Sequence, residues 1–455
     1  MTWVAFMSTA LFWFRTDLRL QDNPGLYEAM HNHDKVILLY IADDSIGAAQ
    51  KWWLYHSLQA LQDALMAKGS HLVLSLNTPQ IAIDKLIKTH QITDIYWNRQ
   101  YSPDAIQRDT ALKSLFKAQH LNVHTFNAYL LNEPWVIKNN ADLPYKVFTP
   151  YWRKASCTLT IPDEKIIVQF KPNPHPDDFP LSTWQLLPEK PNWAVGFEPL
   201  WTPGELGAHD RLEHFIDEQL NDYVVNRDIP KHSGTSRLSP HLHFGEISPQ
   251  QIWRALRTAT PQGLNIKSLE RYQAELGWRE FSYYLLYHFP SLPNKNFNPL
   301  FDNFPWHHDK TLLKAWQQGK TGYPIVDAGM RELWQTGYMH NRVRMIVASF
   351  LTKDLLIDWQ EGARWFYDTL LDADLANNSA SWQWVAGTGA DAAPYFRIFN
   401  PTLQAQKFDP DGAYIKRWVP ELSHLSAKDI HIPRSSIVEH DQARHLALQY
   451  YQGLK

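Results

Sequence analysis

The sequence predicts a doubly wound α/β domain followed by an all-α domain. From residue 10 to about residue 130, short apolar runs alternate with amphipathic helical runs. Beyond residue 204 the helical period dominates to the end of the chain. Alternation of this kind is typical of a parallel sheet covered by helices, whereas an unbroken helical period indicates a helical domain. We therefore expect an α/β domain over residues 8–130, a linker over 131–203 and a helical domain over 204–455.

The first domain should contain about five parallel strands. The five apolar runs that predict strands are, in order, ALFWFR, KVILLYIAD, HLVLSL, ITDIYWNRQ and NVHTFNAYLL. The four helical runs between them are PGLYEAMHNH, WWLYHSLQALQDALMAKG, PQIAIDKLIKTH and DAIQRDTALKSLFKAQ. In such a sheet ligands bind near the carboxyl ends of the strands. No GxGxxG motif follows the first run, so the sequence lacks a dinucleotide-binding fingerprint.

Scattered prolines mark the linker, which we expect to cross the surface with only a few short helical turns. They are Pro172, Pro174, Pro176, Pro180, Pro188, Pro191 and Pro199. Helical runs then follow one another, among them HDRLEHFIDEQLNDYV, SPQQIWRALRTA, KSLERYQAELGWREFSYYLLYHF, KTLLKAWQQG and VDAGMRELWQ. A further run, MHNRVRMIVASFLTKDLLIDW at residues 339–359, predicts one continuous helix.

Composition narrows the classes of function. The chain has 455 residues, 44% of them hydrophobic, which is enough for large cores. With 44 Lys and Arg against 47 Asp and Glu, any nucleic-acid binding must come from a local basic patch. The single cysteine, Cys157, excludes a disulfide framework and a Cys-based metal site. No apolar run reaches the ~18 residues of a membrane helix, so we expect a cytoplasmic protein without a bound metal.

Residues 372 to 401, DADLANNSASWQWVAGTGADAAPYFRIFNP, look like the lining of a site. Acids, amides and indoles crowd a stretch with little helical periodicity. We expect an irregular, locally extended segment, in which Trp382 and Trp384 would point the same way. A loop with capping acids and buried aromatics would explain the same residues if the stretch stood alone.

The run at residues 339–359 carries a second group of polar residues. Asn341 and Met345 are four residues apart and share one helical face, beside Arg342 and Arg344. Arg344 and Asp372 are a plausible buried ion pair. Met345 would ordinarily fill a core.

Two further motifs have both a plain and a functional interpretation. Residues 231–240, KHSGTSRLSP, crowd hydroxyls and an Arg around a Gly, which suits phosphate oxygens, although a polar turn before a helix explains them equally. Glu275 and Trp278 share a helical face with Ser282. Glu275 is either a solvated acid, or it lies beside a flat apolar wall, as recognition of a flipped base requires.

Together these stretches resemble the photolyase and cryptochrome flavoproteins. The resemblance runs from FWFRTDLRLQDN near residue 12 to FDPDGAYIKRWVPEL at 408–422, and it is closest to class I cyclobutane pyrimidine dimer DNA photolyases. It implies a helical FAD-binding catalytic domain and an antenna-type α/β domain. It also implies a repair enzyme in which anionic reduced FAD passes an electron to a pyrimidine dimer in DNA under blue light and recovers it. We expect a monomer without an obligate protein partner.

The resemblance also assigns roles to individual residues. FAD would be bound by Tyr223, Thr235, Ser236, Arg237, Leu238, Ser239, Tyr272, Asp372, Asp374 and Asn378. DNA would be bound by Arg227, Glu275, Trp278, Asn341, Arg342, Trp384, Arg397 and Gln404. Catalysis would involve Glu275, Asn341, Met345, Asn378, Arg344 and Asp372. Electrons would reach oxidised flavin through Trp306, Trp359 and Trp382, which without the resemblance would pass for core residues.

The chain departs from the family pattern in four places. Tyr272 and Tyr338 stand where the family often has Trp, and Ala380-Ser381 stands for Gly-Gly, so we expect altered flavin packing with the chemistry retained. Residues 102–105, SPDA, replace the loop whose acid contacts the pterin in folate-binding relatives. A second antenna chromophore of the folate or deazaflavin type is therefore an open expectation.

Two rival functions are weighed against repair. A cryptochrome-type photoreceptor shares the fold and the flavin but usually carries an extended C-terminal tail, whereas this chain ends about thirty residues after WVPEL. A flavin electron-transfer protein without a DNA role leaves Glu275, Trp278, Asn341 and Trp384 unexplained. The sequence favours the photolyase.

Overall fold

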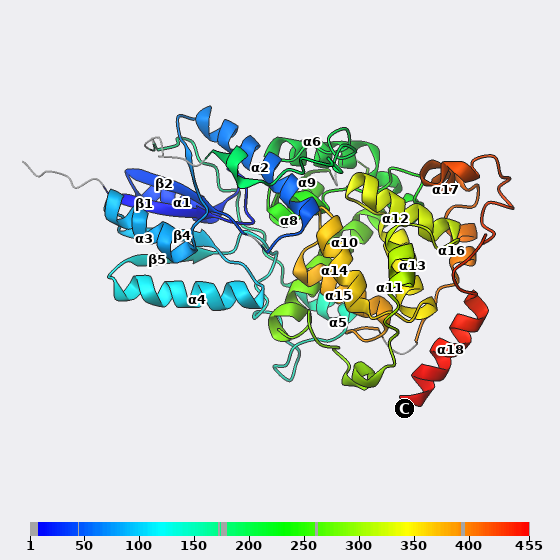
Figure 1. Cartoon of the computed structure of the whole chain (residues 1–455). Helices are drawn as coiled ribbons and strands as arrows, with labels where there is room; N and C mark the ends of the chain where they lie inside the picture. The colour runs from blue at the N-terminus through cyan, green and yellow to red at the C-terminus, as the bar shows by residue number, and fades with distance from the viewer. Residues whose placement is uncertain are drawn as a thin grey trace, which may run out of the picture.

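The structure, a computed structural model, describes residues 8–43, 45–171, 173, 180–259, 263–392 and 396–454. Figure 1 shows a sheet flanked by helices at one end of the molecule and a large group of helices at the other, with the C-terminal helix at the far edge. This is the predicted α/β part followed by a mostly helical part. No helix of the described ranges is both long and apolar enough to cross a membrane.

Within the described residues the sheet has five parallel strands in the order β3-β2-β1-β4-β5. The strands are β1 (Thr9–Phe14), β2 (Lys35–Ile41), β3 (Leu72–Ser75), β4 (Asp94–Asn98) and β5 (Asn122–Phe126). The helices between them are α1 (Pro24–Asn32), α2 (Ala48–Met66), α3 (Pro79–His90) and α4 (Pro103–Ala118). All nine elements lie where the sequence predicts them.

The strands read as continuous apolar runs because both faces of the sheet are buried. In β1, Phe12 and Phe14 join a core with Trp53 of α2. Leu11 and Trp13, with the opposite parity, join a second core with α3 and α4. The alternation of side chains along a strand thus divides β1 between two cores.

The helical part contains thirteen α-helices among the described residues from 205 onwards. They are α6 (Glu205–Glu218), α7 (Tyr223–Asn226), α8 (Ser239–Phe244), α9 (Pro249–Ala259), α10 (Ile266–His288), α11 (Lys310–Gln317), α12 (Pro324–Thr336), α13 (Asn341–Ser349), α14 (Trp359–Thr369), α15 (Leu375–Ala386), α16 (Pro401–Phe408), α17 (Ala413–Trp418) and α18 (His440–Gly453). The largest core of this part joins α12, α13, α14 and α15.

The linker differs from the sequence prediction. It contains α5 (Phe148–Cys157), a ten-residue helix, where only short turns were expected. This helix buries Phe148, Tyr151 and Ala155 in one core with residues of α10. Packing against α10 therefore stabilises a helix that the local sequence pattern does not predict. Of the linker prolines, Pro172, Pro174 and Pro176 lie outside the described residues.

The predicted continuous helix over residues 339–359 is wrong. Helix α13 passes into a single π-helical turn, Phe350–Asp354, and the helix then ends. Leu356 adopts a left-handed backbone with φ of 54°. The Asp358 side chain accepts from the Gln360 backbone N at 3.0 Å and so caps the start of α14. The apolar pattern continues across this break, so the sequence pattern did not show that one helix ends and α14 begins.

The extended conformation predicted around Trp382 and Trp384 is also wrong, because both residues belong to helix α15. Asp374 caps this helix by accepting from the Asn377 backbone N at 2.8 Å, and Gly387 ends it with φ of 86°. Residues two apart on a helix diverge by about 200°. Trp382 is therefore buried while Trp384 is half-exposed.

Buried polar contacts join the two parts of the molecule. The fully buried guanidinium of Arg19 donates to the carbonyls of Gly245, Asp22 and Ala128, each at 2.9 Å. On α2, Trp53 Nε1 donates to Glu246 Oε1 at 2.9 Å. The α/β part and the helices are thus joined by hydrogen bonds that water cannot replace.

The backbones approach closely across this junction at Gly245, which has φ of 65° and whose ideal Cβ would lie 2.1 Å from the Thr16 carbonyl oxygen. Gly69 has a similar φ of 71° with nothing within 4 Å of its Cβ position.

We expect Gly69→Ala to lower the free energy of unfolding only by the cost of a left-handed backbone at a residue with a Cβ, about 1 kcal/mol. Gly245→Ala should lose about 1–3 kcal/mol more through overpacking. Urea unfolding midpoints of the two variants test this, and equal midpoints would show that the junction tolerates a methyl group.

Candidate functional site

The carboxylate of Asp372 joins three segments of the helical part. Arg344 Nη1 and Nη2 of α13 donate to its two oxygens at 3.0 and 2.9 Å. Ser239 Oγ, at the start of α8, donates to Asp372 Oδ2 at 2.6 Å. Burial alone would lower the pKa of Arg344, but the paired Asp372 raises it above its ordinary value, so the guanidinium keeps its charge. The ion pair that the sequence suggested is present.

The KHSGTSRLSP motif leads directly to this junction. Thr235 and Ser236 are half-exposed, and Leu238 is buried. Arg237 has a left-handed φ of 52°, and its guanidinium lies 5.0 Å from the Trp201 ring centroid and 4.8 Å from that of Tyr338. The motif therefore presents hydroxyls beside two arginines, which is a donor set that fits a phosphate-bearing cofactor.

Aromatic residues close one side of the motif. Tyr223 and Tyr272 are both buried, and their rings meet edge to face with centroids 5.3 Å apart. Burial raises the pKa of Tyr272 to a value above its ordinary range, so its hydroxyl is protonated. Tyr272 thus keeps the aromatic character that the family pattern has at this position.

Helix α15 places two amides and an acid beside Asp372. Asp374 Oδ2 accepts from Asn377 Nδ2 at 2.6 Å, in addition to capping the helix. Asn378 Nδ2 donates to the Ala363 carbonyl at 2.9 Å. This bond fixes the orientation of the Asn378 side chain, whose oxygen remains available as an acceptor.

Glu275 of α10 is engaged by two arginines. Arg227 Nη1 donates to Glu275 Oε1, and Arg271 Nη2 lies 3.4 Å from the same oxygen. Arg227, expected to contact the lesion strand, is 9% exposed in this arrangement. Its pKa lies above the ordinary value because the Glu275 carboxylate outweighs the effect of burial.

Trp278 belongs to α10 and Trp384 to α15, two helices that pack against each other. Trp278 stacks on Phe148 of α5, with centroids 3.7 Å apart and planes 10° apart. Ala376 and Ala380 of α15 pack in the same cluster as Trp278. Trp384 follows Ala380 by four residues and therefore continues the same face. Sequence reasoning missed Phe148 as the support of Trp278, because no pattern links these two distant positions.

Helix α13 directs its arginines to different partners. Arg342 Nη2 donates to Asp228 Oδ1 at 2.8 Å, whereas Arg344 binds Asp372. The Met345 sulfur lies 3.8 Å from Arg342 Nη1, and Asn341 is exposed. Sequence reasoning missed Asp228, which directly follows Arg227.

His340 caps α13, with its Nδ1 accepting from the Arg342 backbone N at 3.2 Å. Burial lowers the pKa of His340 to about 4, so this ring is neutral near pH 7. On α16, Gln404 is half-buried, and Arg397 before that helix is exposed, its guanidinium 5.8 Å from the Trp384 ring centroid. Residues 393–395 of the stretch 372–401 lie outside the described residues.

The three tryptophans of the expected electron path belong to one apolar cluster. Trp359 and Trp382 are buried in it, and Trp306 packs against it while half-exposed. Gly362, one turn after Trp359, has its ideal Cβ position 2.1 Å from the Trp382 ring, so only glycine fits there. Trp382 and Trp359 are 2% and 1% exposed, and Trp306 is the most exposed of the three, which fits its expected place at the surface end of the path.

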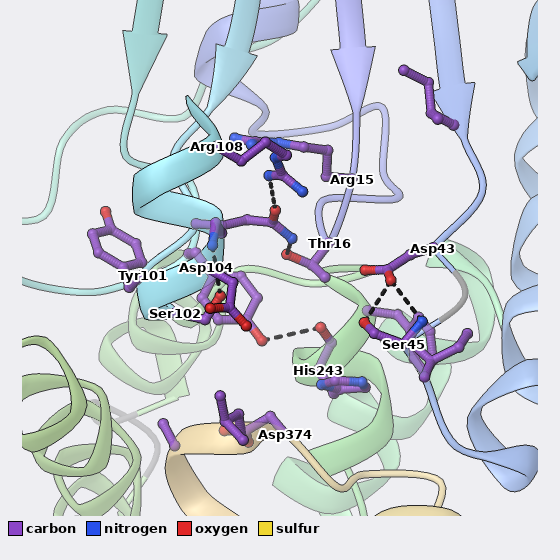
Figure 2. Close-up of a pocket in the computed structure, with 18 of the residues that line it drawn as sticks. Arg15, Thr16, Asp43, Ser45, Tyr101, Ser102, Asp104, Arg108, His243 and Asp374 are labelled. Atoms are coloured by element: carbon purple, nitrogen blue, oxygen red, sulfur yellow. Dashed lines mark hydrogen bonds between the residues drawn. The ribbon is translucent and has the colours of Figure 1, made fainter. Parts of the chain in front are cut away.

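A cavity of about 680 Å³ lies where the carboxyl ends of the strands face the helical part. Figure 2 shows Arg15, Thr16 and Arg108 on the sheet side, and His243 and Asp374 on the opposite side. Ser102 and Asp104 line it too. The sequence suggested a loop at residues 102–105, but Ser102 is the N-cap of α4 and Asp104 lies in its first turn. A smaller cavity of about 210 Å³ adjoins it and is bounded by Trp97, Trp135 and Tyr287. Both cavities are where ligands of a parallel sheet are expected.

The chain matches two family profiles. One, described as DNA photolyase, matches residues 10–174, and the other, described as the FAD binding domain of DNA photolyase, matches residues 272–453. The matches fall on the α/β part and on most of the helical part. The helical region that contains Asp372 is thus an FAD-binding domain of the photolyase type.

Among curated proteins, the deoxyribodipyrimidine photo-lyase of Agrobacterium fabrum is 46% identical and covers 98% of both chains. Cryptochrome-2 of Arabidopsis thaliana is 36% identical over 93% of this chain and 72% of its own. A solved structure described as a bacterial class III photolyase from Agrobacterium tumefaciens has 45% identity and a TM-score of 0.95, covering 100% of this chain and 99% of its own. The expected class I assignment is therefore not confirmed. The chain belongs to the photolyase/cryptochrome family of flavoproteins.

Proposed function

We propose that this protein is a DNA photolyase that uses blue light to split cyclobutane pyrimidine dimers in DNA. The observation that carries the proposal is the arrangement around Asp372. One carboxylate joins the hydroxyl-rich motif, the arginine of α13 and the start of α15. The acid and the indoles suited to a flipped lesion lie on helices α10 and α15, which pack against each other.

FAD would be held by the hydroxyls of Thr235, Ser236 and Ser239 and by Arg344, Asp372 and Asn378. When bound and reduced, FAD supplies an electron to the dimer after absorbing blue light and takes it back once the dimer has split. The retained charge of Arg344 stabilises negative charge on the cofactor beside it. Asp372 orients that charge, because both of its oxygens are bonded to Arg344.

The lesion would enter between Trp278 and Trp384, with Glu275 on its hydrogen-bonding edge and Asn341 and Met345 beside it. Stacking on aromatic walls and hydrogen bonds to the base edge are how a flipped base is recognised. The walls also exclude water, which strengthens the electrostatic contacts inside the pocket. Phosphates around the mouth would be contacted by Arg227, Arg342 and Arg397, with Gln404 nearby, giving affinity with little base specificity.

A second chromophore would occupy one of the two cavities beside the sheet. The larger one offers Arg15 and Arg108 beside the Trp13 ring, with guanidinium-to-centroid distances of 4.9 and 5.1 Å. Such a wall suits a flat, anionic ring system of the folate or deazaflavin type. A monomeric state, the absence of an obligate protein partner and a cytoplasmic location remain predictions from the sequence.

Repair is tested by ultraviolet absorbance of a dimer-containing oligothymidine under blue light, with chemically reduced protein. Recovery of thymine absorbance in the light and none in the dark is expected. A protein that contains reduced FAD but leaves the dimer intact would be a photoreceptor or an electron carrier, and the proposal would fail.

Glu275→Gln should keep FAD bound but weaken lesion binding by about 1–3 kcal/mol, because it removes the charge from a hydrogen bond to the dimer. Gln retains an acceptor for Arg227, so the fold should survive. Glu270→Gln, at an exposed position of the same helix, is the matched control. Lesion affinity and repair per absorbed photon are measured, and wild-type values for Glu275→Gln would remove the residue from the site.

Trp306→Phe should block photoreduction of the oxidised protein, because Phe is far harder to oxidise than Trp. Repair should remain intact when the flavin is chemically reduced beforehand, which is the internal control. Absorbance spectra under blue light with an external reductant report the outcome. Full photoreduction in this variant would exclude Trp306 from the electron path.

Arg342→Ala should make lesion binding less sensitive to salt. Each phosphate neutralised contributes about −0.9 to the slope of log affinity against log salt on duplex DNA, so the slope should flatten by roughly that amount. FAD content should not change, since Arg344 and not Arg342 binds Asp372. A variant with an unchanged slope and lost flavin would place Arg342 on the cofactor side.

A further inference from the structure

Five charged residues form a continuous ladder at the proposed mouth of the lesion pocket. In spatial order they are Arg271, Glu275, Arg227, Asp228 and Arg342. Arg271 and Arg227 both approach Glu275 Oε1. Arg227 Nε and Arg342 Nη2 both approach Asp228 Oδ1, at 3.8 and 2.8 Å. The ladder joins α10 to α13 through the segment after α7, and acids alternate with arginines along it.

Two of the three arginines proposed to contact phosphates, Arg227 and Arg342, are therefore neutralised before DNA arrives. Arg227 is bound to Glu275 and has only a long contact to Asp228. Arg342 is bound to Asp228 and lies over the Phe408 ring, 4.4 Å from its centroid. A phosphate can use Arg342 only by displacing Asp228, whose side chain is 36% exposed. Displacement would leave a partly buried carboxylate without its partner, which is unfavourable.

A lesion changes this balance through Glu275. When Glu275 turns to the edge of the dimer, Arg227 loses its first partner. Asp228 is the acid adjacent to Arg227, so it can take over Arg227 and release Arg342 to a phosphate. Undamaged DNA offers Glu275 nothing, so Arg227 stays occupied and Asp228 stays on Arg342.

We propose that Asp228 is a specificity-determining residue, which keeps Arg342 from undamaged DNA and releases it when a lesion engages Glu275. The ladder thereby couples recognition of the edge of the damaged base to binding of the DNA phosphates. Specificity arises because the competing carboxylate opposes non-specific phosphate binding more than lesion binding. This inference rests on the proposed function, because it assumes that Glu275 meets the lesion and that Arg342 meets a phosphate.

The test measures dark binding of a labelled duplex with one thymine dimer and of its undamaged counterpart, as a function of salt. Asp228→Asn should strengthen binding to the undamaged duplex about two- to fivefold, the range for a partly exposed ion pair. Lesion affinity should stay within about twofold, because Arg342 is already released there. The salt slope on undamaged DNA should steepen by about 0.9, since one more phosphate is neutralised.

Asp411→Asn is the matched control. It makes the same change in net charge and removes a carboxylate that pairs with Lys231 at 2.5 Å outside the ladder. If it strengthens undamaged binding as much as Asp228→Asn does, net charge explains the effect and the inference is overturned. Asp228→Asn should also have no effect in an Arg342→Ala background, because Asp228 acts through Arg342. An effect that persists there overturns the inference.

Glu275→Gln supplies a second route that leaves Asp228 intact, so the test does not depend on the folding of an Asp228 variant. It weakens the bond between residue 275 and Arg227 and lets Asp228 move to Arg227. The affinity for undamaged DNA should therefore rise in the same range, about two- to fivefold. Unchanged undamaged affinity in both Asp228→Asn and Glu275→Gln would overturn the ladder. A wild-type protein that binds the two duplexes equally would refute the proposed lesion recognition itself, and the inference with it.

Discussion

The candidate site depends on a single buried carboxylate, Asp372. Its two oxygens accept two bonds from Arg344 and one from Ser239, so three segments that are distant in the sequence meet at one group. Without it, the partly buried guanidinium of Arg344 would lose its counter-charge, which is unfavourable. The position of α13 follows from this pairing. With Arg344 fixed on Asp372, Arg342 must leave the helix in another direction, toward Asp228.

The same pairing of charges bears on the proposed binding of DNA by a nearly neutral protein. The formal net charge is −3, so no general field draws DNA to the surface. Three arginines around the proposed site are nevertheless present, each matched by its own acid: Asp372, Glu275 or Asp228. An arginine paired with a carboxylate attracts a distant phosphate weakly. It binds the phosphate strongly only after the phosphate has replaced the carboxylate. The affinity of such a surface is decided by which carboxylates a ligand can displace, and less by the number of its cations.

The α/β part could be predicted element by element because its strands are buried on both faces and its helices on one. Strand runs and helix runs therefore differ in the period of their apolar residues. Phe12 and Trp13 are both apolar because each faces a core, although the two cores lie on opposite faces of the sheet. Helix α15 was missed because residues turned toward a site, such as Asn378, interrupt the apolar stripe on which a helix prediction depends. The end of the helix that begins with α13 was missed because leucine does not usually adopt the left-handed backbone that Leu356 has after it.

Within the site, the predictable contacts were those between groups of obvious chemistry in neighbouring motifs. The pair Arg344 and Asp372 is one of these. The stacking of Phe148 on Trp278 and the pairing of Asp228 with Arg342 join residues that are far apart in the chain. Their side chains have no periodic relation, so only the folded chain brings them together. The roles carried over by resemblance concerned single residues, whereas the ladder depends on how those residues pair.

Helix α15 is a wall shared by two sites. Asp374 and Ala376 line the cavity beside the sheet, whereas Asn378, one turn after Asp374, belongs to the proposed flavin site. A helix rises 1.5 Å per residue, so Asp374 and Asn378 are separated by about 6 Å along its axis. Asp374 caps the helix at one end, and buried Trp382 anchors it against Gly362. Both sites are built on this one rigid, capped helix. The distance between their occupants is therefore set by packing inside the helical part and by the hydrogen bonds of Arg19 and Trp53. It does not depend on a movement of the two parts of the molecule relative to each other.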